Sequence, residues 1–258
     1  MDKHADDLPS RRHTLSDWLA LHELDPVACR RILDAVAREA ASAPAGHKKW
    51  SALPSRALDP EADWLRTADA MRAFFPAQRS IIDDTFQKTV KTLVDQRSKS
   101  PRALTLDNGP STYPTILYSY LGEPSDSLVI AHEFAHALQI RASRGKFVPP
   151  IIREVCAFIG ERALLSHALY SNAAQYRRLF KVWHRDNQRY LGTNRDHLNS
   201  ALLRPEMPYN YLWNYPIARY LAIQISQRCP QDRMWTLFEG DLSVRGVLRE
   251  LAFEPSLA

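Results

Sequence analysis

One apolar segment, residues 128–138, constrains the fold of this chain more than any other feature. Its sequence, LVIAHEFAHAL, is hydrophobic on nearly every side of a helix, which is typical of a helix buried in a protein core. The same segment nevertheless carries His132, Glu133 and His136. Buried polar groups are costly unless they are bonded. We therefore expect this helix to pack against elements that supply partners for these three side chains.

The spacing of these residues, H-E-x-x-H, indicates a metal as that partner. His132 and His136 are four positions apart, so both imidazoles project from one helix face and can share a tetrahedral zinc ion. Glu133 lies beside that face, where it can take a proton from a zinc-bound water molecule. The alternative interpretation is two core histidines that are hydrogen-bonded to the backbone.

A catalytic zinc site needs a third protein ligand and leaves the fourth position for water. The helix predicted to begin at Pro149-Pro150 contains Glu154 and Glu161, which are two helical turns apart and share a face. We expect Glu154 to bind the metal and Glu161 to accept the outer N–H of a liganding histidine. The alternative for each glutamate is a salt bridge with a neighbouring arginine.

The rest of the pattern predicts a mainly α-helical chain with one short strand or small sheet. Residues 115–121 (TILYSYL) are β-branched and aromatic and predict the strand. Further helices are expected to begin at Thr14 and at Asp25-Pro26, to run from Asp59-Pro60 to about Phe75 and from Pro76 to about Gln96, and to cover 171–190, 209–228 and 231–252.

We divide the 258 residues into a disordered N-terminus (1–13), a helical N-terminal region (14–100) and a zinc metallopeptidase catalytic domain (101–258), with a proline-containing connection at 42–58. The sequence contains no run of 18 apolar residues, so we expect no membrane span. The N-terminus lacks the apolar stretch of a signal peptide. The three cysteines lie far apart, which fits a reducing compartment.

The charge pattern does not indicate a nucleic-acid-binding protein. The 34 basic residues exceed the 29 acidic ones to give a net charge of +5, but the basic residues are scattered and match no nucleic-acid-binding motif. We therefore expect no membrane or nucleic acid as partner. The peptide or protein substrate that we expect follows instead from the H-E-x-x-H motif, which is typical of metallopeptidases. The expected location is the cytoplasm, or the outside of the cell by a signal-peptide-independent route, as an effector.

Three blocks of sequence, taken in order, resemble the M3 family of zinc metallopeptidases, which includes thimet oligopeptidase and oligoendopeptidase F. The first is the strand and H-E-x-x-H helix over 116–138. The second is Glu154 followed by Glu161, and the third is the tyrosine-rich segment 209–215, YNYLWNY. Together they cover roughly residues 110–225, under half of the chain. The family often has a further histidine where this chain has Gln139.

The resemblance implies a zincin-like helical catalytic fold of the gluzincin type, one zinc ion and hydrolysis of peptide bonds. It implies that 115–121 is an edge strand that pairs with the substrate backbone. It also implies that a tyrosine stabilises the oxyanion, a role that the alignment gives to Tyr211. The residues expected to contact the substrate are Tyr118, Tyr120, Tyr209, Tyr215 and His197.

The sequence therefore predicts a zinc metalloendopeptidase in which Glu133 activates the water. One alternative is a repressor-cleaving metallopeptidase of the ImmA/IrrE type, which is also short and built on H-E-x-x-H. Another is a non-catalytic zinc-stabilised interaction domain. Glu133 argues against the latter, because a structural zinc site does not need this residue and usually closes with a fourth ligand.

Overall fold

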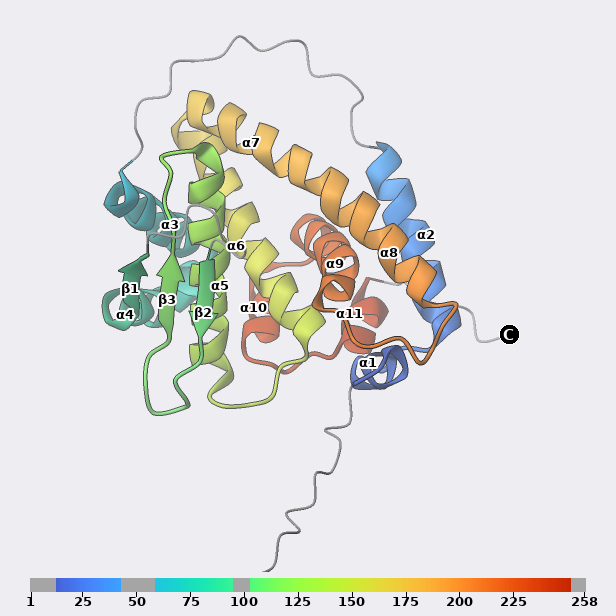
Figure 1. Ribbon diagram of the computed structural model, residues 1–258. Coiled ribbons are helices and arrows are strands. Elements are labelled where there is room, and N and C mark those ends of the chain that lie inside the picture. The colour runs from blue at the N-terminus through green and yellow to red at the C-terminus, as the bar shows by residue number, and fades with distance from the viewer. Residues whose placement is uncertain (1–12, 43–58, 95–102, 252–258) are drawn as a thin grey trace, which may run out of the picture.

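The computed structural model describes residues 13–42, 59–94 and 103–251. In these ranges the chain is mostly helical with one small sheet, which confirms the predicted mainly α fold (Figure 1). The expectations of a disordered N-terminus and of a connection at 42–58 fall almost wholly outside the described residues. Among the described residues, no helix combines the length and the apolar character needed to cross a bilayer.

Two helices form the centre of the protein. Helix α5 (Pro124–Ser143) contains the H-E-x-x-H motif, and α6 (Pro150–Ser171) follows it after a short loop. Each begins with proline in its first turn, where the fixed backbone angle suits a helix and the missing N–H has no intrahelical role. Helix α6 packs against α5, α9 (Asn214–Arg228) and α3 (Pro60–Phe74), so it is enclosed on several sides.

Gly160 lets α5 and α6 approach closely. A Cβ atom at this position would lie 2.6 Å from the carbonyl oxygen of Ala131 and 2.6 Å from the Cβ of Ala135, closer than such atoms come in proteins. Ala131 immediately precedes His132, and Gly160 immediately precedes Glu161. The contact therefore lies directly beside the residues that were predicted to build the metal centre.

The sheet lies against α5 and has three short strands, β1 (Val90–Leu93), β2 (Ala103–Leu106) and β3 (Thr115–Tyr118). Their order is β1-β3-β2, with β1 parallel and β2 antiparallel to β3 (Figure 1). The strand predicted at 115–121 is thus confirmed over 115–118. Its prediction as an edge strand is wrong, because a further short strand pairs with each of its two sides, and within the described residues these two strands form the edges.

The helix predicted from Pro76 to Gln96 is correct only in its first part. A 3₁₀ turn (Pro76–Gln78) leads into α4 (Arg79–Lys88), and the next residues form β1. Val90 and Thr92 are β-branched, and β1 pairs with β3 along its whole length. Pairing with a strand that is distant in the sequence therefore overrides the helical pattern. The end of the predicted helix, beyond residue 94, lies outside the described residues.

The remaining helices cover the other side of α6. Helix α7 (Ala173–Asn187), a π-helical turn (Gln188–Thr193) and α8 (Asn194–Ala201) follow one another as a long rod, and α2 (Pro26–Ser42) lies beside it (Figure 1). The other elements are α1 (Leu15–Leu21), the 3₁₀ turn Tyr211–Trp213, α10 (Gln231–Phe238) and α11 (Val244–Glu250). One hydrophobic core includes residues from both the N-terminal and the C-terminal parts of the chain.

Replacing Gly160 with alanine tests the close helix contact. The added methyl group meets a backbone oxygen that cannot rotate away, so we expect Gly160→Ala to lower the free energy of unfolding by about 1 to 3 kcal/mol, as overpacked cores do. Gly192 is the matched control, because nothing lies within 4 Å of a Cβ built there. Gly192→Ala should be neutral or slightly stabilising. Urea unfolding measures both, and a Gly160→Ala variant as stable as the wild type would contradict the contact.

Candidate metal centre

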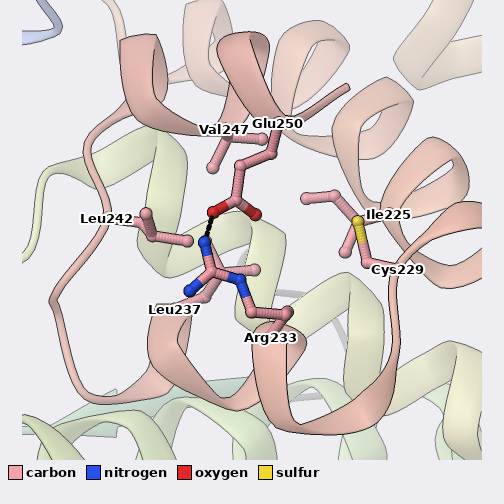
Figure 2. A pocket seen from close by; sticks show the side chains of 7 residues that line it. All are labelled: Ile225, Cys229, Arg233, Leu237, Leu242, Val247 and Glu250. Atoms are coloured by element: carbon pink, nitrogen blue, oxygen red, sulfur yellow. Dashed lines mark hydrogen bonds and ion pairs between the residues drawn. The ribbon is translucent and has the colours of Figure 1, made fainter. Parts of the chain in front are cut away.

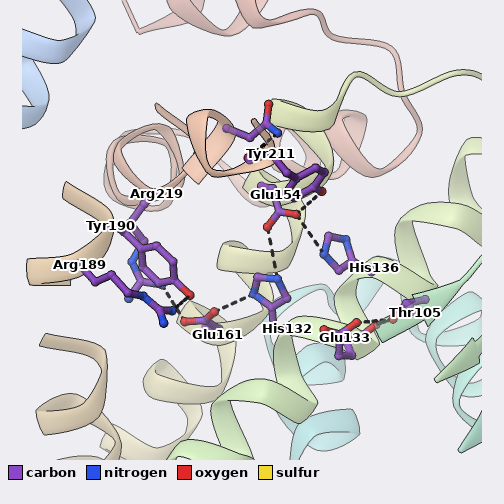
Figure 3. A network of polar contacts seen from close by, with 11 residues as sticks. Thr105, His132, Glu133, His136, Glu154, Glu161, Arg189, Tyr190, Tyr211 and Arg219 are labelled. Atoms are coloured by element: carbon purple, nitrogen blue, oxygen red, sulfur yellow. Dashed lines mark hydrogen bonds and ion pairs between the residues drawn. The ribbon is translucent and has the colours of Figure 1, made fainter. Parts of the chain in front are cut away.

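His132, His136 and Glu154 come together where α5 meets α6. Their potential ligand atoms all lie within 4.8 Å of one another. His132 Nε2 is 3.3 Å from Glu154 Oε2, and His136 Nε2 is 3.6 Å from Glu154 Oε1 (Figure 3). The three residues predicted as ligands therefore form one group, which could hold a metal ion.

The charge states of Glu154 and His136 fit a bound cation. Burial alone would raise the pKa of Glu154, but the facing His136 and contacts with His132 and Tyr211 lower it to about 2 and leave a carboxylate. Burial lowers the pKa of His136 to about 3 and leaves a neutral imidazole. Both are the forms that bind metals. Glu154 Oε2 is buried and accepts no hydrogen bond within the described residues, so it has capacity for an ion.

The remaining nitrogen of His132 faces a second carboxylate. His132 Nδ1 lies 2.8 Å from Glu161 Oε1, and the other oxygen of Glu161 lies 2.7 Å from Arg219 Nη1 (Figure 3). Burial alone would lower the pKa of His132, but the contacts with Glu154 and Glu161 raise it well above its usual value. This environment favours positive charge at His132. The contact with Glu161 has the geometry expected of a residue that orients a metal ligand.

Glu133 points away from its two histidine neighbours and toward β2. Thr105, in that strand, donates a hydrogen bond from its hydroxyl to Glu133 Oε2 at 2.7 Å (Figure 3). Burial raises the pKa of Glu133, although His132 and Thr105 oppose the change. Thr105 was not identified from the sequence. The turn residues Asp107 to Pro110 follow it closely, so the sequence pattern indicated a turn rather than a strand.

Tyr211, in the tyrosine-rich segment 209–215, contacts the cluster directly. Tyr211 donates a hydrogen bond to Glu154 Oε1 at 2.6 Å. Its ring centre is 5.8 Å from that of Tyr215, whose hydroxyl makes no hydrogen bond to a described residue. Burial raises the pKa of Tyr215, and the nearby charges of Glu154 and Glu133 contribute. The hydroxyl of Tyr209 instead accepts a hydrogen bond from Asn214 at 2.9 Å.

The other three predicted substrate contacts lie elsewhere. Tyr118 is buried against Trp64, with ring centres 5.4 Å apart, and Tyr120 donates a hydrogen bond to Asp63 at 2.6 Å. His197, in α8, lies near the ring of Trp213. The expectation for the two tyrosines depended on an edge strand at 115–121, whereas β3 is central. The structure does not bring these three residues to the cluster.

Helix α1 holds the tyrosine-rich segment in place. The Trp18 indole donates a hydrogen bond to Asn214 Oδ1 at 2.8 Å. Leu15 N donates to Met207 O at 2.9 Å, and Tyr209 N donates to His13 O at 2.8 Å. The start of the described chain is therefore bonded to both ends of the segment that carries Tyr211. This connection could not be read from the sequence, because the partners are almost 200 residues apart.

A small pocket lies between α9, α10 and α11 and shares no residue with the cluster (Figure 2). The ion pair between Arg233 and Glu250 crosses it, and its other walls are mainly apolar. Its lining residues are Ile225, Cys229, Arg233, Leu237, Leu242, Val247 and Glu250.

Comparison with known proteins gives a fold relationship. No family model matches the chain, and no curated protein matches it. Among solved structures, it is similar to the crystal structure of a candidate peptidase from Chlamydophila abortus, with a TM-score of 0.60 and 13% identity. The match covers 92% of this chain and 53% of that one, so this chain spans about half the length of that protein. At this identity the likeness shows the fold.

His22, at the C-terminal end of α1, makes the stability of the protein depend on pH. His22 is buried beside Trp18, and burial lowers the pKa of its imidazole to about 4, an effect that Asn214 only partly opposes. The unfolded chain binds this proton with a pKa near 6.5, so stability present above pH 6.5 is lost as the pH falls toward 4. Between pH 7 and pH 4.5 the free energy of unfolding should therefore fall by about 2 to 3 kcal/mol less in His22→Phe than in the wild type. Urea unfolding at both pH values tests this, and equal falls in the two proteins would contradict it.

Proposed function

We propose that this protein is a zinc-dependent metalloendopeptidase of the gluzincin type. The observation that carries the proposal is the convergence of His132, His136 and Glu154, with Glu133 beside them on the same helix. Two imidazole nitrogens and one carboxylate oxygen are a donor set of catalytic zinc sites. The fold relationship to a candidate peptidase supports the proposal, as does the order of the M3-like blocks.

The ligands and the base have separate tasks. A zinc ion held by His132, His136 and Glu154 would polarise the scissile carbonyl and make a water molecule more acidic. Glu133 would accept the proton of the attacking water and pass it to the leaving amine. Its raised pKa suits a group that must both take and give a proton. The hydrogen bond from Thr105 keeps its carboxylate at a fixed angle.

We propose that the substrate lies along β2 rather than along β3. Strand β2 pairs with β3 on one side and, within the described residues, has no strand on its other side. Thr105 of β2 touches Glu133, so this edge runs beside the proposed base. An extended peptide that adds to a sheet edge is held by backbone hydrogen bonds. This position would bring its carbonyl groups past the cluster.

We assign the oxyanion donor to Tyr215 and give Tyr211 a different task. The hydroxyl of Tyr211 already donates a hydrogen bond to the carboxylate of Glu154. It would have to break this bond before it could donate to the substrate. The hydroxyl of Tyr215 has no such bond and lies in the field of both Glu154 and Glu133. A donor that does not first have to give up another partner stabilises a developing negative charge at the lowest cost. Tyr211 would instead orient the Glu154 ligand.

The variant Glu133→Gln tests the proposed reaction. The amide cannot accept a proton but keeps the size of the side chain, so zinc should stay bound while peptide cleavage falls by about 10² to 10⁴. Zinc is measured by elemental analysis and cleavage with a peptide library. Glu206→Gln changes an exposed glutamate and is the control. Full activity in Glu133→Gln would reject the role. A wild type that binds zinc but cleaves no peptide would instead favour the interaction domain.

Phenylalanine substitutions separate the two tyrosines. Tyr215→Phe should lower kcat by about 10² with little change in KM, because the lost hydrogen bond belongs to the transition state. Tyr211→Phe should act mainly on zinc affinity. Tyr170→Phe, at a position that is 87% exposed, is the control. Unchanged kcat in Tyr215→Phe together with a large loss in Tyr211→Phe would return the oxyanion role to Tyr211.

A further inference from the structure

Arg219 is a fully buried arginine in an otherwise apolar part of α9. Its side chain has no solvent exposure. Burying a guanidinium costs several kcal/mol unless partners compensate for the lost water. A charge kept at such a position needs partners that hold it firmly, and these partners indicate what it does.

Three hydrogen bonds and neighbouring aromatic rings hold the Arg219 guanidinium in place. Nη1 donates to Glu161 Oε2 at 2.7 Å, Nε donates to Asn187 Oδ1 at 2.7 Å, and Nη2 donates to the Trp183 carbonyl at 3.3 Å. The guanidinium carbon also lies 3.0 Å from the centre of the Trp183 ring and 4.7 Å from the centre of the Phe158 ring. These partners belong to α6 and α7, so the position of the guanidinium is set by three packed helices and cannot adjust freely.

The contact continues from Arg219 to the metal centre. A carboxylate is planar, so holding Glu161 Oε2 against Arg219 also sets the direction of Oε1. That oxygen lies 2.8 Å from His132 Nδ1, and the opposite nitrogen of the same ring faces Glu154 at 3.3 Å (Figure 3). Arg219, Glu161 and His132 thus form one chain of contacts that ends at a proposed ligand atom.

We propose that Arg219 is a positioning residue for the metal centre, which acts through Glu161 to hold the imidazole of His132 with Nε2 toward the ion. The inference rests on the proposed function only in requiring that His132 binds a metal. Residues that orient a ligating histidine usually change metal affinity by 10- to 100-fold when they are replaced. Arg219 acts one residue further out, and the rigidity of its own contacts lets it do so.

Zinc affinity measures this role without any assay of activity. Dissociation constants are obtained by competition with a chromophoric chelator for the wild type, Arg219→Met, Glu161→Gln and the double variant. Each single variant should bind zinc about 10- to 100-fold more weakly. Because Arg219 acts through Glu161, the double variant should be no more than about threefold weaker than the weaker single variant.

Arg162 provides the matched control. It also lies over the Trp183 ring, at 5.8 Å, but it has no hydrogen bond to Glu161. Arg162→Met should therefore keep wild-type zinc affinity within about threefold. The proposal is overturned if a folded Arg219→Met binds zinc like the wild type, if the losses of the two single variants multiply in the double variant, or if Arg162→Met loses as much as Arg219→Met.

Circular dichroism of the metal-free proteins checks that each variant folds. If Arg219→Met does not fold, Arg219→Lys takes its place. A lysine keeps the charge but has a single nitrogen that cannot hold Glu161 and Asn187 together. It should weaken zinc binding at least fivefold, and wild-type affinity in this variant would overturn the proposal. Two other results would instead count against the proposed function. One is a wild type that does not bind zinc, and the other is a Glu154→Ala variant that binds zinc as tightly as the wild type.

Discussion

The close crossing of α5 and α6 determines the rest of this structure. Gly160 has no side chain, and a Cβ atom at this position would clash with α5. His132 and Glu161 lie immediately beside this contact. Two turns before Glu161 in α6, Glu154 meets both histidines of α5. The candidate metal centre is therefore a product of helix packing, since the crossing of the two helices is enough to bring its three proposed ligands together.

Burial makes this arrangement demanding. Polar groups inside a protein must be paired, and a network that is only partly paired is destabilising. Glu161 is fully paired, with His132 on one side and Arg219 on the other. Glu154 has Tyr211 and the two histidines around it, but one of its oxygens still lacks a hydrogen bond. Within the described residues, the network leaves two buried atoms without a hydrogen bond: Glu154 Oε2 at its centre, where a cation would fit, and the outer nitrogen of His136, Nδ1.

The sequence predicted the parts of this account that are local. The H-E-x-x-H helix, the glutamate helix and their shared faces follow from helical periodicity, and the structure has them as predicted. The sequence did not predict what depends on distant pairing. Strands β1 and β2 are four residues each and are stabilised by β3, so their own sequences carry little signal. Thr105 and Arg219 reach the site through tertiary contacts, although a lone charge within the apolar run of α9 was a visible sign. The bond between Trp18 and Asn214 joins residues at opposite ends of the chain.

The central claim is that α5 and α6 together bind one ion. Diffraction from zinc-soaked crystals at the zinc absorption edge tests it most directly, because the anomalous signal locates the metal independently of any assay. The account predicts a single peak about 2.0 to 2.2 Å from His132 Nε2, His136 Nε2 and a carboxylate oxygen of Glu154. A peak bound elsewhere, or no peak with Glu154 turned away from both histidines, would contradict it.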